Sequence, residues 1–181
     1  MPSTLPLPKI IGPGPADLSA QQSFSPSFYA PYAAAAQTAL SALCRARRRL
    51  IAETGEDVRA VTYRLKTPAS IRSKLLSRGL PATQEAAASL HDIAGLRAVL
   101  PSVELVYRFA TLLAESPALE IIDQRDYIAA PKRSGYRSLH LVALVRAAEG
   151  EDAAVPVEIQ LRTAPMDIWA SIEHQLVYKP V

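Results

Sequence analysis

The chain has 181 residues, of which 49% are hydrophobic and 20% are charged, an ordinary balance for a soluble globular protein. This length suits one domain with a sizeable core and an appendage. The net charge of +3 and the isoelectric point near 9.1 make the chain mildly basic. Such a balance favours anionic ligands and is too weak, by itself, to predict binding to DNA.

Signals for membranes, secretion and disulfides are missing from the sequence. No run of 18 apolar residues occurs, so we expect no membrane span and no membrane partner. The N-terminus has no charged segment followed by an apolar one, and it therefore does not resemble a secretion signal. Cys44 is the only cysteine, which rules out an intrachain disulfide and fits a cytoplasmic protein in a reducing environment.

The first 54 residues divide into two segments. Residues 1–31 hold seven prolines among serines and glycines, which predicts a disordered or extended tail. Residues 32–54 show a helical apolar stripe from Ala36 to Leu50. Four cations stand near the end of this stripe, where they favour the helix dipole; contact with single-stranded RNA is the alternative interpretation. They are Arg45, Arg47, Arg48 and Arg49.

A second set of cations surrounds the start of a short predicted helix. An extended piece covers residues 58–66, and Thr67 and Pro68 then provide an N-cap and a proline at the first helical position. A helix N-terminus favours anions, so the cations between 64 and 78 predict a triphosphate site. A solvated basic helix is the alternative. The cations are Arg64, Lys66, Arg72, Lys74 and Arg78.

The remaining elements alternate between helices and strands. We expect a short helix over 82–90, a strand over 93–100, a helix from 103 to 117, a short apolar run at 119–122, a strand over 139–145, a turn at 150–154, a strand over 155–162 and a last helix after Thr163. In the last helix we expect Ile168, Trp169, Ile172 and Leu176 to point inward. This order predicts an α/β (α+β) fold, a mixed β-sheet flanked by helices.

A basic loop leads into the strand at 139–145. Pro131 and Gly135 punctuate it, and Tyr136 stands among three cations, Lys132, Arg133 and Arg137. Cations bind phosphates and a flat ring stacks on a base, so the loop predicts a nucleotide clamp at the mouth of a strand. The alternative is a solvated basic hairpin with a packed tyrosine.

Two carboxylates have positions that suit a metal site. Strand 155–162 alternates strictly, which gives Glu158, Gln160 and Arg162 one polar face. Asp92 stands at the start of strand 93–100, and Arg97 within that strand needs a partner or a ligand. A pair of carboxylates from two strands holds Mg²⁺, which arrives with substrate phosphates. The sequence leaves open whether Asp92 and Glu158 meet.

Several other chemistries are disfavoured. The sequence contains no GxxxxGK[ST], GxSxG, HExxH or CxxC motif. His91 and Asp92 would be candidate ligands for a transition metal, but the chain has only three histidines and none precedes His91. What remains is phosphate binding by cations, an aromatic ring and two carboxylates. This combination predicts transfer of a phosphoryl-type group between nucleotides.

Long motifs in a fixed order carry a resemblance to a known family. They are RLKTPASIRSK at 64–74, DIAGLR at 92–97, DYI at 126–128 with PK at 131–132 and GYRSLH at 135–140, VEIQLRT at 157–163, and WASIEH at 169–174 with YK at 178–179. The chain resembles the RelA/SpoT synthetase domain, and specifically the small alarmone synthetases. The resemblance implies one nucleotidyltransferase-like synthetase domain over 32–181. It also implies transfer of pyrophosphate from ATP to the 3′-hydroxyl of GDP or GTP, which gives (p)ppGpp and AMP in stringent-response signalling.

The resemblance further implies roles for single residues. Asp92 and Glu158 would carry Mg²⁺ and be catalytic, with Glu158 also serving as a base. ATP would be bound by Arg64, Lys66, Ser70, Lys74, Arg78 and Arg97, with Arg97 against adenine. GDP or GTP would be bound by Arg125, Lys132, Tyr136, Ser138, His140 and Gln160, with Tyr136 against guanine. Arg78 stands beside Ser77, where some relatives have the arginine.

The chain departs from the family pattern at its end. Small synthetases usually continue past the pair matching Tyr178 and Lys179 into helices that help to build a tetramer, so we expect a homotetramer only where those C-terminal oligomerisation helices are present. Two alternatives remain open. One is a toxin-type relative that pyrophosphorylates tRNA 3′ ends or adenine nucleotides, although the GYRS stretch at 135–138 favours a guanine acceptor. The other is an inactive nucleotide- or RNA-binding module.

Overall fold

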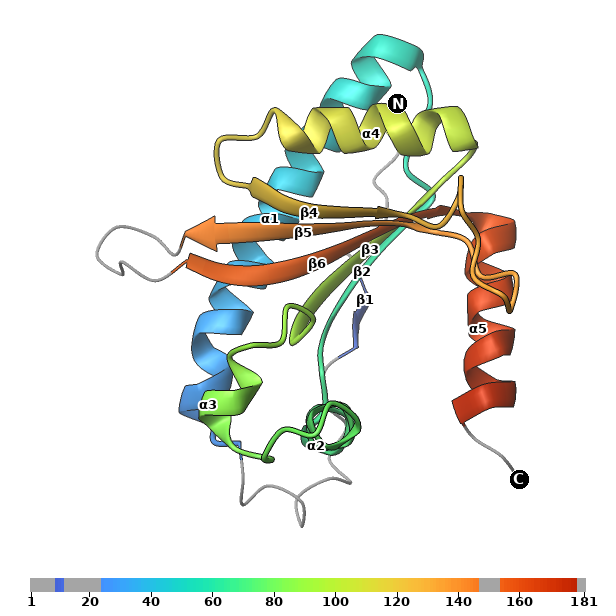
Figure 1. Ribbon diagram of the computed structural model, residues 1–181. Helices are drawn as coiled ribbons and strands as arrows, with labels where there is room; N and C mark the ends of the chain where they lie inside the picture. The colour runs from blue at the N-terminus through green and yellow to red at the C-terminus, as the bar shows by residue number, and fades with distance from the viewer. Residues whose placement is uncertain (1–8, 12–23, 147–153, 179–181) are drawn as a thin grey trace.

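The computed structural model describes residues 9–11, 24–146 and 154–178 (Figure 1). Helices and strands alternate along these residues. In chain order they are β1 (Lys9–Ile11), α1 (Pro26–Thr54), β2 (Ala60–Leu65), α2 (Pro68–Ser77), α3 (Gln84–Ala87), β3 (Ala94–Leu100), α4 (Val103–Ala114), β4 (Glu120–Asp126), β5 (Leu139–Arg146), β6 (Ala154–Thr163) and α5 (Ala164–Tyr178).

The described strands form one mixed sheet of six, in the order β1-β2-β3-β6-β5-β4. β1 is parallel to β2 and β3 is parallel to β6, whereas the other neighbours are antiparallel. The parallel pair β3 and β6 lies at the centre and joins two segments that are far apart in the sequence. This mixed sheet with flanking helices confirms the predicted fold class.

Alternation along the central strands separates an apolar face of the sheet from a polar one. On β3 the residues Leu96 and Ala98 are buried, and on β6 Ile159 and Leu161 are buried in the same way. Helices α1 and α4 pack against each other and against these strands (Figure 1). Burial of each Leu or Ile side chain stabilises the folded state by about 1.5–3 kcal/mol. The face covered by α1 and α4 therefore contributes to the hydrophobic core. The opposite face carries the polar side chains of these strands.

The N-terminal segment differs from the prediction. Helix α1 begins at Pro26 rather than at residue 32, with Ser25 as its N-cap, and β1 is a strand within the predicted tail. Phe24 and Tyr32 are 3% and 8% exposed, and both rings contact Phe28. These aromatic rings supply apolar area that the proline count concealed. Pro31 stands inside α1 beyond the first turn, where a proline removes one backbone hydrogen bond of the helix. Residues 1–8 and 12–23 lie outside the described residues.

Other elements differ in extent or orientation. β4 runs to Asp126 rather than ending at 122, because it is an edge strand whose polar residues hide the pattern. α3 covers only Gln84–Ala87 of the predicted 82–90.

In α5 the residues predicted to point inward are exposed, so that expectation was wrong. The side chain of Leu176 lies outside the described ones. The exposed residues are Ile168, Trp169 and Ile172. The predicted turn at 150–154 falls mostly in an undescribed segment.

Two of the four arginines of α1 join this helix to other parts of the fold. Arg47 pairs with Asp57 ahead of β2, and Arg49 pairs with Glu53 and with Glu115 beyond α4. The helix continues to Thr54, so none of these cations stands in its last turn. Arg45 and Arg48 remain exposed, and contact with RNA stays a prediction for them. No helix in the described part of the chain is long and apolar enough to cross a membrane.

Candidate active site

The polar face of the sheet carries six of the predicted site residues, which are Arg64, Arg97, Arg125, His140, Glu158 and Gln160. Residues paired across neighbouring strands project to the same face. One row across the sheet consists of Thr62, Arg97, Gln160, His140 and Arg125. The next row consists of Arg64, Gly95, Glu158, Val142 and Asp123. Five strands thus bring the predicted donor and acceptor residues onto one surface.

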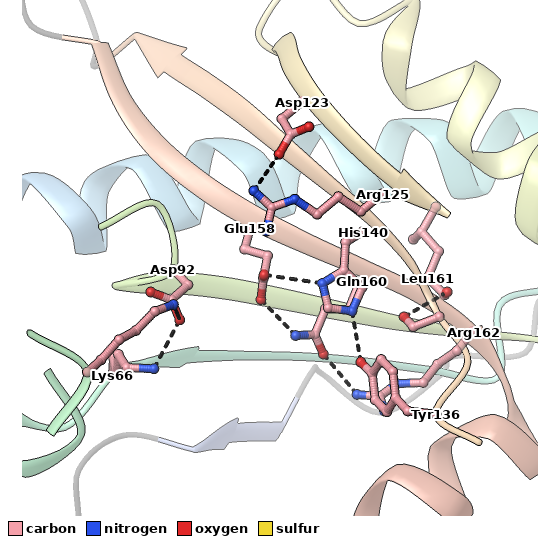
Figure 2. A network of polar contacts seen from close by, with 12 residues as sticks. Lys66, Asp92, Asp123, Arg125, Tyr136, His140, Glu158, Gln160, Leu161 and Arg162 are labelled. Atoms are coloured by element: carbon pink, nitrogen blue, oxygen red, sulfur yellow. Dashed lines mark hydrogen bonds and ion pairs between the residues drawn. The ribbon is translucent and has the colours of Figure 1, made fainter. Parts of the chain in front are cut away.

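Asp92 lies two residues before β3 and contacts two lysines. Its Oδ2 accepts hydrogen bonds from Nζ of Lys66 at 3.0 Å and from Nζ of Lys74 at 2.7 Å (Figure 2). Its Oδ1 is buried and has no hydrogen-bond partner among the described residues. Burial acts to raise the pKa of Asp92, but the hydrogen bonds and charges of Lys74 and Lys66 outweigh burial and lower it. The carboxylate is therefore ionised, with one oxygen unused.

The other predicted ATP-binding residues lie on different elements and at different distances from Asp92. Arg64 is exposed on β2 and shares a row with Glu158. Ser70 lies in the first turn of α2, where its backbone N–H donates to Oγ1 of the N-cap Thr67. Arg78 is the C-cap of α2, at the opposite end of the helix from Ser70. Its role at an ATP site stays a prediction.

Arg97 has the partner that the sequence reasoning required, and this partner was missed. Its Nη1 lies 3.3 Å from Oδ1 of Asp167, in the first turn of α5. The same oxygen lies 3.2 Å from Nε of Arg162. From the sequence Asp167 is only an acidic residue near a helix start, which is a common arrangement. A pairing with two strand arginines cannot be read from that signal.

Glu158 lies at the centre of a chain of polar contacts (Figure 2). Its Oε2 accepts from Nε2 of Gln160 at 2.7 Å, and its Oε1 lies 3.3 Å from Nδ1 of His140. Burial acts to raise the pKa of Glu158, but the hydrogen bonds and charge from His140 and the hydrogen bond from Gln160 outweigh burial and lower it. An ionised carboxylate only accepts, so Nδ1 of His140 carries a hydrogen.

His140 joins Glu158 to the basic loop. Its Nε2 lies 2.8 Å from the hydroxyl of Tyr136, and in the neutral ring this nitrogen accepts because Nδ1 donates. Nζ of Lys132 lies 4.8 Å from the ring centre of Tyr136 and 4.7 Å from that of Tyr127. Tyr127 also packs edge-on against His140. Tyr127 belongs to the DYI motif at 126–128, and no role was predicted for it from the sequence.

One predicted acceptor residue is buried. Ser138 is 0% exposed, and its hydroxyl donates to the carbonyl oxygen of Leu161 at 3.2 Å (Figure 2). In this conformation the side chain joins the loop to β6, and a contact of Ser138 with the acceptor stays a prediction. Arg125 is exposed on β4 and pairs with Asp123 at 2.9 Å, within reach of the polar face.

The turn of the loop is held from α5. Gly135 has φ of +83°, a backbone conformation that residues with a side chain rarely adopt. This glycine lies against the indole ring of Trp169. The indole Nε1 donates to the carbonyl oxygen of Ser134 at 3.1 Å. At the other end of the loop Asp126 accepts from the backbone N–H groups of Ile128 and Ala129. These contacts give the loop a defined shape with Tyr136 turned toward His140.

The two carboxylates fit magnesium. Asp92 is close enough for its charge to act on the pKa of Glu158, in the direction of a rise. The buried Oδ1 of Asp92 without a hydrogen-bond partner is a candidate ligand atom. Among the described residues no group of three or more His, Cys, Asp or Glu could hold a metal. Mg²⁺ requires no such group, since it binds through one or two carboxylates and completes its shell with phosphates and water.

The described residues form a mixed sheet with one helix-covered face and one face of cations and carboxylates, a fold class that matches solved structures of alarmone synthetases. The chain belongs to the RelA/SpoT family: the family model described as a region found in RelA / SpoT proteins matches residues 63–181. Membership confirms the resemblance drawn from the motifs.

Named relatives agree with this membership. The chain is 42% identical over 121 residues to the GTP pyrophosphokinase YjbM of Bacillus subtilis, an alignment that covers 66% of this chain and 56% of the relative. It thus spans little more than half of this relative.

Solved structures are also similar. The small alarmone synthetase 1 of Bacillus subtilis bound to its product pppGpp has a TM-score of 0.75 and 38% identity, over 84% of this chain and 79% of that one. The same synthetase bound to AMPCPP has a TM-score of 0.67 and 32% identity, over 84% and 77%.

Proposed function

We propose that the chain transfers the β,γ-pyrophosphate of ATP to the 3′-hydroxyl of GDP or GTP, giving (p)ppGpp and AMP. Family membership and the GTP pyrophosphokinase relative support this activity. The product pppGpp in one similar structure supports a guanine acceptor. AMPCPP, a methylene analogue of ATP, in another supports an adenine donor.

The position of Glu158 is the observation that carries the proposal. Its carboxylate lies between the cations near Asp92 and the basic loop that holds Tyr136. The side chain is ionised and oriented by two neighbours, His140 and Gln160. A base in this position would lie between a bound ATP donor on one side and a bound nucleotide acceptor on the other.

The donor side is suited to a triphosphate. Lys66 and Lys74 would exchange the carboxylate of Asp92 for phosphate oxygens, with Arg64 beside them on β2. Arg97 would pack on the adenine from β3. Bound at Asp92 and Glu158, Mg²⁺ would neutralise the reacting phosphates.

The acceptor side is suited to a guanine nucleotide. The ring of Tyr136 would stack on the base, and Lys132 would move from the two tyrosine rings to the acceptor phosphates. Arg125 and His140 would complete the phosphate contacts from the neighbouring strands β4 and β5. In this arrangement the acceptor ribose would point toward Glu158.

The transfer is a single displacement. Glu158 accepts the proton of the 3′-hydroxyl as the 3′ oxygen forms a bond to the β-phosphorus of ATP. The bond between that phosphorus and the α,β-bridging oxygen breaks, and AMP leaves with the oxygen. The chain contributes alignment of the two nucleotides and charge neutralisation by its cations.

Transfer of labelled phosphate tests the proposal. The protein is incubated with Mg²⁺, ATP labelled at the β-phosphate, and GDP, GTP, ATP or deacylated tRNA as acceptor. Label on GDP or GTP with release of AMP is the expected result. Label on tRNA or ATP alone would assign the chain to the toxin-type relatives. Calorimetric binding of nucleotides without any transfer would overturn the proposal in favour of a binding module.

A further inference from the structure

Arg162 is a charged side chain that the proposed reaction does not use. It stands near the end of β6, and its side chain is 1% exposed. Its Nη2 donates to Oε1 of Gln160 at 2.9 Å, while its Nε and Nη1 have no hydrogen-bond partner among the described residues. A guanidinium buried in this way is costly, and it is too deeply buried to touch a nucleotide on the sheet surface.

The contact with Arg162 fixes the orientation of the Gln160 amide. A guanidinium has donors and no acceptor, so the amide oxygen of Gln160 must face it. The amide NH₂ group then faces the other way, toward Oε2 of Glu158 at 2.7 Å. Without Arg162 the amide oxygen loses its donor, and the side chain of Gln160 is free to rotate away from the carboxylate.

The orientation of Gln160 in turn holds Glu158. One oxygen of Glu158 receives the amide hydrogen, and the other faces Nδ1 of His140. With both oxygens directed, the carboxylate has one preferred rotamer and presents a defined edge to the open polar face. Figure 2 shows the run from Arg162 through Gln160 to Glu158 and His140. The run crosses from the end of β6 to the proposed reaction centre.

The buried guanidinium is held from α5. Oδ1 of Asp167 lies 3.2 Å from Nε of Arg162 and 3.3 Å from Nη1 of Arg97. The side chain of Asp167 is 32% exposed, which leaves it at the border of the site. The first turn of α5 thereby connects the guanidinium behind Gln160 with Arg97 on the proposed adenine side.

We propose that Arg162 is a positioning residue that acts through Gln160 to orient the carboxylate of Glu158, and that Asp167 holds Arg162 in place. This inference rests on the proposed function, because Glu158 is the proposed base. It assigns Arg162 no contact with either nucleotide. Replacement of Arg162 should therefore lower the rate of transfer and leave nucleotide binding unchanged.

The first test separates rate from binding in the variant Arg162→Met, whose long apolar side chain fills a similar volume. We expect kcat to fall by about 10- to 100-fold, as for a misplaced catalytic group. The dissociation constants of AMPCPP and GDP, measured by calorimetry, should stay within about twofold of those of the unmodified protein. The control Arg47→Met removes a half-buried, paired arginine away from the polar face, and it should leave kcat unchanged.

A double-mutant cycle tests whether the effect passes through Gln160. Arg162→Met should lower kcat in the unmodified chain and have little further effect in a Gln160→Leu background. Arg162→Lys keeps a donor-only group toward the amide and should restore part of the rate. Additive losses in the cycle, or a folded Arg162→Met variant with normal kcat, would overturn the proposal.

A spectroscopic readout keeps the test independent of activity. The side-chain amide resonances of Gln160 are assigned by their loss in Gln160→Leu. In the unmodified protein we expect one amide hydrogen to be shifted and slowly exchanging, because it is bonded to Glu158. Arg162→Met should abolish the shift and the slow exchange of this hydrogen. Asp167→Asn should weaken both, and it is the variant to use if Arg162→Met does not fold. Unchanged resonances would refute the positioning role even if the protein transferred no pyrophosphate, whereas absent transfer with changed resonances would refute only the proposed function.

Discussion

Gly95 of β3 lies directly opposite Glu158 of β6 and, on its other side, opposite Arg64 of β2. A Cβ atom at position 95 would meet Arg64 Cγ and the backbone oxygen of Glu158 at 4.0 Å, which are ordinary contacts. The backbone of Gly95 is not in the positive-φ region, so other residues can adopt it. A side chain here would occupy the open space between a donor cation and the proposed base without disturbing the sheet.

We therefore expect Gly95→Val to fold normally and to lose activity. The melting temperature should be unchanged or higher, because valine favours strands more than glycine does. The kcat/KM for ATP should fall by at least about tenfold, and Gly95→Ala should show a smaller loss. Thermal unfolding and steady-state kinetics check both. Full activity in Gly95→Val would mean that no substrate crosses this part of the sheet.

Glu158→Gln is expected to separate chemistry from binding. The amide keeps the shape of the carboxylate but accepts no proton, so kcat should fall by about 10²- to 10⁴-fold. Calorimetry should show that AMPCPP still binds. Glu120→Gln, at the start of edge strand β4, is the matched control and should be fully active. Retained synthesis in Glu158→Gln would remove Glu158 from the chemistry.

The polar face could be predicted from the sequence where local periodicity sets it. The alternation along β6 gave Glu158, Gln160 and Arg162 one face, and the structure agrees because a strand has a period of two. The position of Asp92, near enough for its charge to act on the pKa of Glu158, could not be predicted in this way. It depends on the parallel pairing of β3 with β6, a tertiary contact between distant segments that leaves no local pattern.

The misses have physical causes as well. Apolar residues of α5 were expected inside because of their helical spacing, yet Trp169 lies 46% exposed beside the basic loop and donates to the carbonyl oxygen of Ser134. Ser138 was assigned to the acceptor from its place in a motif, whereas its side chain is buried and donates to the carbonyl oxygen of Leu161 on β6. The prolines of the first 31 residues outweighed Phe24 and Phe28, whose rings pack together. Composition does not reveal which apolar groups find partners.

Tyr136→Ala should affect the acceptor much more than the donor. The loss of one base-stacking ring costs about 1–3 kcal/mol, so the KM of GDP should rise roughly 5- to 150-fold. The KM of ATP should change little. Tyr127→Ala should show a weaker effect in the same direction, because its ring shares Lys132 with Tyr136. Equal effects on both nucleotides would give Tyr136 a purely structural role.

A divalent cation must compete with Lys66 and Lys74 for the carboxylate of Asp92. We expect Mn²⁺, a paramagnetic substitute for Mg²⁺, to bind weakly to the free protein and more tightly with AMPCPP, whose phosphates attract the lysines. Lys74→Met removes one competing charge and should tighten Mn²⁺ binding to the free protein about tenfold. Arg59→Met is the charge-matched control. Unchanged Mn²⁺ affinity in Lys74→Met, measured by electron paramagnetic resonance, would contradict the competition.

The pair of Arg47 and Asp57 should make stability depend on pH. The hydrogen bond from Arg47 lowers the pKa of Asp57 below its ordinary 3.8. A carboxyl group with a lowered pKa stabilises the folded state fully above its ordinary value, and the contribution is lost as the pH falls through the lowered pKa.

Asp57→Asn should therefore be less stable than the unmodified protein at pH 7, by at most about 1 kcal/mol because both groups are partly exposed. The difference should begin to shrink near pH 3.8 and disappear as the pH falls through the lowered pKa of Asp57, where the aspartate of the folded protein becomes protonated and the pair is lost. Urea unfolding midpoints at pH 7, 5 and 3 measure it. A difference that is the same at every pH would mean that Asp57 acts by packing and that its charge contributes nothing to the junction between α1 and β2.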